Sequence, residues 1–470
     1  MDNQSIATDE TIKKIPIMIV LISGAFVAIL NQTLLGTALP HIMSDLNLDA
    51  NTVQWLQSVF MLVNGIMIPV TAFLIGTFTT RRLFITAMGL FTIGTLVCAI
   101  APGFSVLLSG RILQAAGAGI IMPLMQTILM LIFPIEKRGT AMGMFGLVIA
   151  FAPAIGPSLS GYIVEHFPWR TLFFMILPIA IIDIIVAYFI LKNVTKQTFP
   201  KLDVLSIILS TLGFGGILYG FSIAGSAGWT SEQVVISMIV GLLTLAWFIL
   251  RQFKLKQPIL EFRVFKYKIF TITTVLGMVT FMVMIGSAVV LPLYMQTMLG
   301  FSAFESGLAL LAGAVLQGIM NPITGRLFDK YGARYLAITG LSLIVVTTFM
   351  FGFLTPDTSF MYISMVHAVR MMGVAMAMMP VTTAGLNMLP NDLIAHGTAV
   401  NNTLRQVSGA IGTALPITIM TTATIPNQGV QGMIHGVNIS FIAIGVVSIV
   451  GLILAFFVND RKTSRKISVG

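Results

Sequence analysis

Fourteen long apolar stretches, separated by short polar gaps, run through this sequence. Each has roughly the 20 apolar residues that a helix needs to cross about 30 Å of hydrocarbon. Continuous apolar runs indicate helices, because the strands of a membrane barrel would alternate apolar and polar residues. The predicted spans are 16–37, 53–75, 83–101, 105–133, 139–163, 171–191, 204–224, 233–250, 269–297, 303–325, 335–354, 359–388, 398–423 and 436–458. The pattern predicts an all-α integral membrane protein with 14 transmembrane helices.

Lysine and arginine lie mainly at the two ends of the chain and in every second gap between spans. Arg81 and Arg82 occupy one such gap, and a basic cluster runs from Arg251 to Lys268 in another. Of the remaining gaps, only the one before the sixth span carries a cation, Arg170. Since cytoplasmic loops retain Lys and Arg, both termini are predicted to lie in the cytoplasm.

The composition excludes several classes of protein. With 470 residues, 57% hydrophobic and 9% charged, a water-soluble domain is excluded. The net charge of +10 does not indicate nucleic-acid binding, because the cations flank apolar segments. Cys98 is the only cysteine, so no intrachain disulfide can form. We find no nucleotide-binding glycine loop, metal-ligand cluster or nucleophile–base pair, and we expect no enzyme activity, no cofactor and no metal site.

The two halves of the chain repeat each other. Matching residues occur in the same order at nearly constant spacing: Gly76, Arg111, Pro123 and Gly139 in the first half, and Gly325, Arg370, Pro380 and Gly397 in the second. Duplicated halves with a site between them are typical of secondary transporters. We predict an N-terminal six-helix bundle (1–198), an inserted two-helix hairpin with a linker (199–260) and a C-terminal six-helix bundle (261–470). Charge bias alone cannot distinguish twelve spans from fourteen, because leaving out 204–224 and 233–250 together would keep every other loop on the same side of the membrane. The hydropathy of these two stretches favours fourteen spans.

A glycine- and charge-rich tract follows the tenth predicted span. Its marked residues are Gly325, Arg326, Asp329, Gly332 and Arg334. A glycine permits close helix approach, and an aspartate can cap a helix while pairing with arginines. The tract resembles the cytoplasmic loop signature of the major facilitator superfamily; the alternative is an ordinary basic turn.

The fourth span contains Arg111, in the run Arg111-Ile112-Leu113-Gln114. An arginine inside a span costs about 2.5–3.5 kcal/mol on insertion scales, so it must face protein, water or substrate. The run resembles the fourth-span motif of drug/proton antiporters, and this resemblance implies a part for Arg111 in proton coupling. The alternative is that Arg111, about two turns from the outer end, extends to the interface.

The fifth span is rich in glycine and proline. Its marked residues are Gly146, Pro153, Gly156, Pro157 and Gly161. Small residues allow close helix packing and the prolines remove backbone donors, which gives a kinked helix suited to sealing against the other half. The segment resembles the fifth-span motif of facilitator-superfamily antiporters; the alternative is a generic kinked helix.

The end of the first span, Leu30-Asn31-Gln32-Thr33, resembles the signature of fourteen-span drug/proton antiporters, the group of the quaternary-ammonium and lincomycin exporters. That group commonly has an aspartate where this chain has Asn31. Because Asn31 cannot titrate, a carboxylate role cannot be transferred to it. We expect Asn31, with Gln114, Asn64 and Met376, to line a substrate cavity.

Proton coupling needs a titratable or charged group inside the membrane. Asp183 is the only acidic residue near the middle of a span, and it serves either proton exchange or packing. His367 and Arg370 lie three residues apart, on one face of the twelfth span. Together with Arg111, these are the candidate coupling residues.

The resemblance implies a facilitator-superfamily fold in a bacterial inner or plasma membrane. It also implies a monomeric, proton-driven antiporter that exports lipophilic or cationic toxic compounds by alternating access. One alternative is an exporter of an endogenous lipid, nucleotide or metabolite with incidental drug transport. Two others are a non-transporting membrane sensor or scaffold and a nutrient symporter.

Overall fold

The computed structural model describes residues 13–198 and 202–459, and these residues form fourteen long α-helices joined by short connections. The first six helices are α1 (Lys14–Asp45), α2 (Ala50–Thr77), α3 (Thr80–Ala99), α4 (Phe104–Ile132), α5 (Arg138–His166) and α6 (Thr171–Ile190). The next two are α7 (Val204–Ala227) and α8 (Glu232–Lys254). The last six are α9 (Lys268–Leu293), α10 (Ala303–Tyr331), α11 (Ala333–Met350), α12 (Phe360–Asn387), α13 (Ile394–Ala423) and α14 (Gly429–Ala455). The predicted number of helices is confirmed.

Thirteen helices in the described part of the chain are long and apolar enough to cross a membrane. The exception is α13, whose sequence includes His396, Asn401, Asn402, Arg405 and Gln406. This helix packs against α2, α4, α7, α9 and α14, so protein surrounds it on several sides. Protein contacts can accommodate the polar side chains that hydrocarbon would disfavour.

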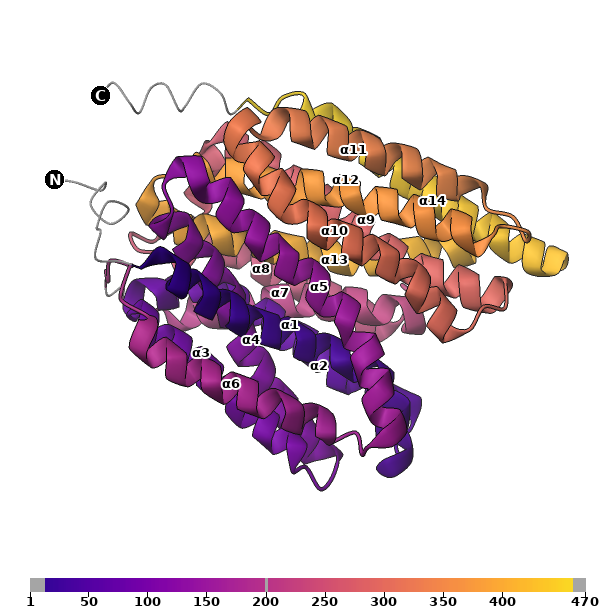
Figure 1. Ribbon diagram of the computed structural model, residues 1–470, viewed down its shortest axis with the longest axis horizontal. Coiled ribbons are helices and arrows are strands. Elements are labelled where there is room, and N and C mark those ends of the chain that lie inside the picture. The colour runs from indigo at the N-terminus through magenta and orange to yellow at the C-terminus, as the bar shows by residue number, and fades with distance from the viewer. Residues whose placement is uncertain (1–12, 199–201, 460–470) are drawn as a thin grey trace.

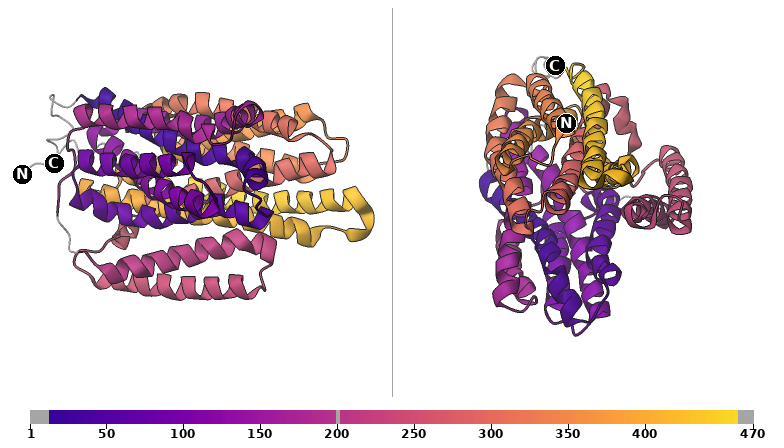
Figure 2. Two further views of the ribbon diagram at one scale, coloured as in Figure 1. Left: turned by 90° about the horizontal axis from the view of Figure 1, so that it is seen from below. Right: turned by 90° about the vertical axis from the view of Figure 1, so that its right-hand side faces the viewer.

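Helices α1–α6 form one group and α9–α14 form another; the two groups lie side by side, and α5 and α10 pack extensively on each other between them (Figure 1). We call these groups the N-half and the C-half. The start of α1 and the end of α14 lie at the same end of the molecule, which we call the termini side (Figures 1 and 2). The predicted boundary at residue 199 lies outside the described residues.

The hairpin α7–α8 lies along one side of the two halves (Figure 2). Helix α7 contacts both α2 of the N-half and α13 of the C-half. On α2, Trp55 stacks on Tyr219 with ring centroids 5.9 Å apart. At the end away from the termini side, the Trp229 indole donates to the Thr418 hydroxyl of α13 at 2.7 Å. The hairpin is therefore peripheral but touches both halves.

A carboxylate ties the two hairpin helices together at their termini-side ends. Asp203 caps α7 and accepts two hydrogen bonds from Arg251 of α8, at 2.9 and 3.1 Å. The Arg251 guanidinium holds the pKa of the Asp203 carboxyl below its ordinary value. This bidentate pair fixes the register of the hairpin.

Helix α10 corrects one prediction. The tract from Gly325 to Arg334 was expected to form a loop after the tenth span, but α10 continues to Tyr331 and α11 begins at Ala333. Only Gly332 turns the chain, with φ 80°. Charged residues are compatible with helix once it leaves the hydrocarbon, so the hydropathy boundary underestimated the helix length.

Candidate functional site

The two halves meet where the start of α5 lies against the end of α10, on the termini side. The Asp329 carboxylate of α10 accepts hydrogen bonds from the backbone N–H groups of Gly139 and Thr140, at 2.7 and 2.8 Å. It also accepts one from the Thr140 hydroxyl at 2.6 Å. A carboxylate at a helix N-terminus is favoured by the unpaired N–H groups and the helix dipole there. We call this interaction the α5–α10 contact.

Glycines let α5 and α10 approach this closely. A Cβ added at Gly143 would lie 2.6 Å from the Asn321 carbonyl oxygen and 3.2 Å from the Gly325 Cα. A Cβ added at Gly325 would lie 3.1 Å from the Gly143 Cα. Any larger residue at either position would force the two backbones apart.

The three glycines of the predicted fifth-span motif lie in different environments. A Cβ at Gly146 would meet the Asn321 side chain and Met379 of the C-half, both at 2.8 Å. A Cβ at Gly156 would meet Thr33 of α1, inside the N-half, whereas nothing lies within 4 Å of one at Gly161. Pro153 and Pro157 lie within the continuous helix α5. Of this motif's glycines, Gly146 is the one that packs on the C-half.

The loop-motif residues also separate by position. Asp329 makes the cross-half bonds already described, and Gly325 packs on α5. Arg326 and Arg334 are exposed, and Gly332 provides the turn. The contact between halves therefore depends on the aspartate and the first glycine of the tract.

Two further hydrogen bonds join the halves near the termini side. Arg138 of α5 donates to the Asn387 side chain at the end of α12, at 3.0 Å. Asn402 of α13 donates to Gln126 of α4 at 2.7 Å. In Figure 1 the halves lie closest near the termini, and their helices spread apart towards the opposite end. The described residues thus adopt a state closed on the termini side.

Inside the N-half, Arg111 is fully buried among neutral groups. Its Nη1 donates to the side-chain oxygens of Asn31 at 2.9 Å and Gln114 at 2.8 Å. Its Nε donates to the Leu56 carbonyl at 3.1 Å, and its guanidinium carbon lies 4.3 Å from the Phe60 ring centroid. The structure thus brings Arg111, Asn31 and Gln114 together, and it buries Arg111 within protein.

The network extends from Gln114 to a fourth polar residue. The Gln114 amide donates to the Thr95 hydroxyl of α3 at 2.8 Å. Arg111 Nη2 has no hydrogen-bond partner among the described residues. The guanidinium therefore keeps a donor available, and its nearest partners are carboxamides and a carbonyl rather than carboxylates.

The corresponding arginine of the C-half has a simpler environment. Arg370 is fully buried, and its Nη2 donates to the Val283 carbonyl of α9 at 2.8 Å. His367 packs instead against α10, where a Cβ added at Gly313 would lie 2.8 Å from its Nε2. Within the described residues, Arg370 Nε and Nη1 and His367 Nδ1 have no hydrogen-bond partners. The two side chains share a helix but face different neighbours.

The remaining candidates lie away from Arg111. Asp183 of α6 is buried against α1, beside Gly24, and its side chain is hydrogen-bonded to Ser23. Met376 packs its Cβ against Gly340 of α11, where an added Cβ would lie 3.0 Å away.

The predicted cavity residue Asn64 packs against α4 through its backbone. A Cβ added at Gly119 of α4 would lie 2.9 Å from the Asn64 carbonyl oxygen. Among the described residues, the hydrogen bonds of the Arg111 network include neither Asn64 nor Met376.

Sequence reasoning missed the pair Arg138–Asn387, because a cation beside a span indicates topology and does not reveal a partner on another helix. The pair Gln126–Asn402 had a usable signal, since both are amides within predicted spans. Polar side chains within spans commonly hydrogen-bond between helices.

Comparison with known proteins adds family evidence. A family model described as Major Facilitator Superfamily matches residues 21–413. The chain is 57% identical over 441 residues to the uncharacterized MFS-type transporter YcnB of Bacillus subtilis (strain 168), covering 93% of each chain. It is 44% identical over 463 residues to the lincomycin resistance protein LmrB of the same organism, covering 96% of this chain and 97% of LmrB.

Among solved structures, the human organic anion transporter MFSD10 (TETRAN) superposes with a TM-score of 0.70. The alignment covers 94% of this chain and 99% of that one, at 12% sequence identity. At this identity the likeness concerns the fold.

Proposed function

The chain belongs to the major facilitator superfamily, a family of secondary transporters in the cell membrane, and on that premise we propose that it is a proton-coupled antiporter. Its proposed cargo is lipophilic or cationic toxic compounds, which it exports by alternating access. One observation carries the export proposal: similarity to a protein named for lincomycin resistance extends over 96% of this chain.

The proposed mechanism alternates between two openings of the same bundle. If the termini side faces the cytoplasm, as the charge pattern predicts, the described state is closed to the cytoplasm. Breaking the α5–α10 contact and the Arg138–Asn387 bond would let the halves separate there. Rocking of one half against the other around a fixed site is the general mechanism of duplicated transporters.

For coupling, we propose that Arg111 is the central group. It lies between α1, α2 and α4, three neighbouring helices of the N-half, and it holds side chains from two of them. Proton arrival or cargo binding that changes the Asn31 or Gln114 contacts would alter the packing of these helices. Asn31 and Gln114 are the proposed substrate contacts, and His367 and Arg370 are the C-half candidates for coupling.

Asp183 is the second candidate for the proton site. It is a buried carboxyl, but α6 packs on α1, α3 and α5 within the N-half rather than on the C-half. A residue on a peripheral helix does not change neighbours when the two halves separate. The partners of Arg111 also lie within the N-half, but its helix α4 and the neighbouring α2 pack on α13 of the C-half, which favours Arg111 over Asp183 for coupling.

A cellular efflux assay tests the proposal. Cells expressing the chain are loaded with lincomycin or a lipophilic cationic dye, and efflux is followed before and after a protonophore is added. We expect export above vector control that stops when the proton gradient collapses. Export that persists without the gradient would exclude proton coupling, and absence of export for all compounds would exclude the proposed drug cargo.

A further inference from the structure

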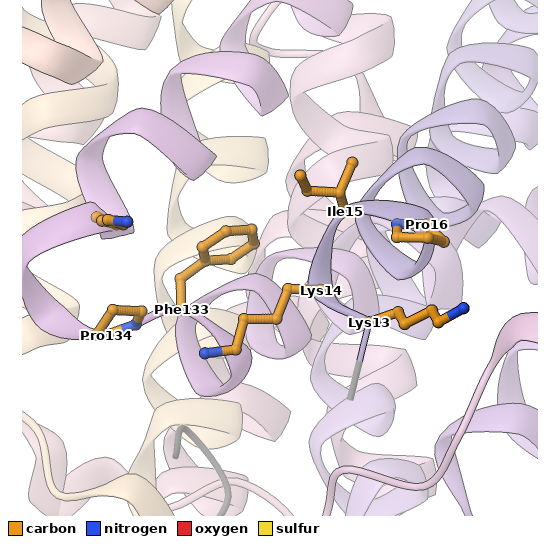
Figure 3. A pocket seen from close by; sticks show the side chains of 7 residues that line it. Lys13, Lys14, Ile15, Pro16, Phe133 and Pro134 are labelled. Atoms are coloured by element: carbon orange, nitrogen blue, oxygen red, sulfur yellow. The ribbon is translucent and has the colours of Figure 1, made fainter. Parts of the chain in front are cut away.

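A basic cavity of about 480 Å³ lies on the termini side, between the start of α1 and the connection from α4 to α5 (Figure 3). Lys13 and Lys14 contribute from the first segment, and Lys137 contributes from the second. Two stretches more than a hundred residues apart in sequence thus contribute lysines to the lining of one cavity. The Lys14 side chain points towards Phe133 and Pro134, whereas the Lys13 side chain points away from them (Figure 3). Among the described residues, Glu136, the neighbour of Lys137, is exposed and is not one of the lining residues.

The rest of the lining is apolar. Phe133 and Pro134 lie on one side, and Ile15 and Pro16 lie on the other (Figure 3). Ile15 is 63% exposed, as are many large apolar side chains on the outer surface of the described residues, the surface that faces lipid in a membrane protein.

The position along the two helices gives the depth of the cavity. Lys13 and Lys14 come directly before the apolar part of α1, and Lys137 follows shortly after α4. Residues at the ends of membrane spans lie at the level of the lipid headgroups, where lysines extend towards phosphates.

We propose that this cavity binds the phosphate headgroup of an anionic membrane phospholipid. The lysines of the lining provide positive charge for a phosphate, with Lys14 pointing towards Phe133 and Pro134 (Figure 3), and basic pockets between membrane helices are suited to such headgroups. The apolar side chains of Ile15 and Phe133, on opposite sides of the cavity, would contact the glycerol and upper acyl carbons. Free inorganic phosphate has no apolar part that could contact these side chains, so we propose a lipid as the ligand.

The cavity is connected to the contact between the halves. Phe133 lines the cavity, and its backbone carbonyl accepts a hydrogen bond from Arg138 Nε at 3.3 Å. The same guanidinium reaches Asn387 of the C-half through Nη1. A bound lipid would thus hold the segment that positions Arg138, so lipid binding and closure on the termini side share one structural element.

Native mass spectrometry of the full-length protein in detergent tests the proposal, with phosphatidylglycerol, phosphatidylcholine and inorganic phosphate as separate probes. The test variant carries Lys13→Gln, Lys14→Gln and Lys137→Gln. A matched control replaces three exposed lysines on the termini side, Lys254→Gln, Lys256→Gln and Lys266→Gln, which lie outside the cavity.

We expect phosphatidylglycerol to bind wild type and control alike, and the test variant at least about tenfold more weakly, since each lysine near a membrane surface attracts anionic lipid. Equal affinity for both lipids, or equal losses in test and control variants, would overturn the proposal. If inorganic phosphate bound as tightly as phosphatidylglycerol, the proposal that the ligand is a lipid would be wrong.

A second variant, Ile15→Glu, keeps all three lysines and places a carboxylate among the apolar side chains of the lining. It should weaken phosphatidylglycerol binding while the protein elutes as wild type in size-exclusion chromatography. Undiminished binding in this variant would also overturn the proposal, and it keeps the test decisive if the triple variant does not fold.

Discussion

Removing the charge of Asp329 should open the termini side. In Asp329→Asn, one carboxylate oxygen becomes an NH₂ group that faces the N–H donors of Gly139 and Thr140. A hydrogen bond to a charged group contributes about 1.5–3 kcal/mol, and the partial exposure of Asp329 reduces this value. A net loss of about 2 kcal/mol would shift the equilibrium between closed and open states about 30-fold towards opening.

Spin-label distances across the termini side measure this shift. Labels at Arg82→Cys in the N-half and Asp392→Cys in the C-half occupy exposed positions, in a Cys98→Ser background that removes the only native thiol. We expect a longer distance population in Asp329→Asn. Glu136→Gln, at an exposed carboxylate of the α4–α5 connection, is the matched control and should keep the wild-type distribution. An unchanged distribution in Asp329→Asn would refute the role given to the α5–α10 contact.

Three further substitutions test other parts of the mechanism. Arg111→Ala should abolish gradient-driven export while the protein still reaches the membrane, because the network around the guanidinium is lost; full activity in an efflux assay would remove Arg111 from the mechanism. Gly143→Ala should disfavour closure by about 1–3 kcal/mol, because the added Cβ clashes with α10. Gly161→Ala, with open space at its Cβ, should transport as wild type. Equal transport rates in these two variants would contradict the packing argument. Asp183→Asn should retain proton-coupled transport, because an amide preserves a polar partner for α1; loss of pH dependence would instead identify Asp183 as the proton carrier.

Hydropathy and charge alternation predicted the helices, because each span must satisfy its own backbone hydrogen bonds in lipid. They failed at the end of α10, where charged residues continue the helix beyond the hydrocarbon, and they give no hint of how deeply α13 is enclosed by protein.

The site was predictable only in part. The sequence analysis assigned Arg111 to proton coupling and Gln114 to the substrate cavity, and the structure joins the two side chains by a hydrogen bond of 2.8 Å. The contact of Arg111 with Asn31 depends on how α1 packs on α4, which no local pattern encodes. The repeat likewise predicted that Arg370 corresponds to Arg111, but its partner on α9 is a backbone carbonyl, because the neighbouring side chains differ between halves.

Transport by the purified protein in liposomes under an imposed pH gradient tests the central claim most directly. We expect cargo to move against the direction of proton flow, to reverse when the gradient is reversed, and to stop in Arg111→Ala. Cargo that moves with the protons would identify a symporter, and no solute movement after a pH step would contradict the assignment of this chain as an antiporter.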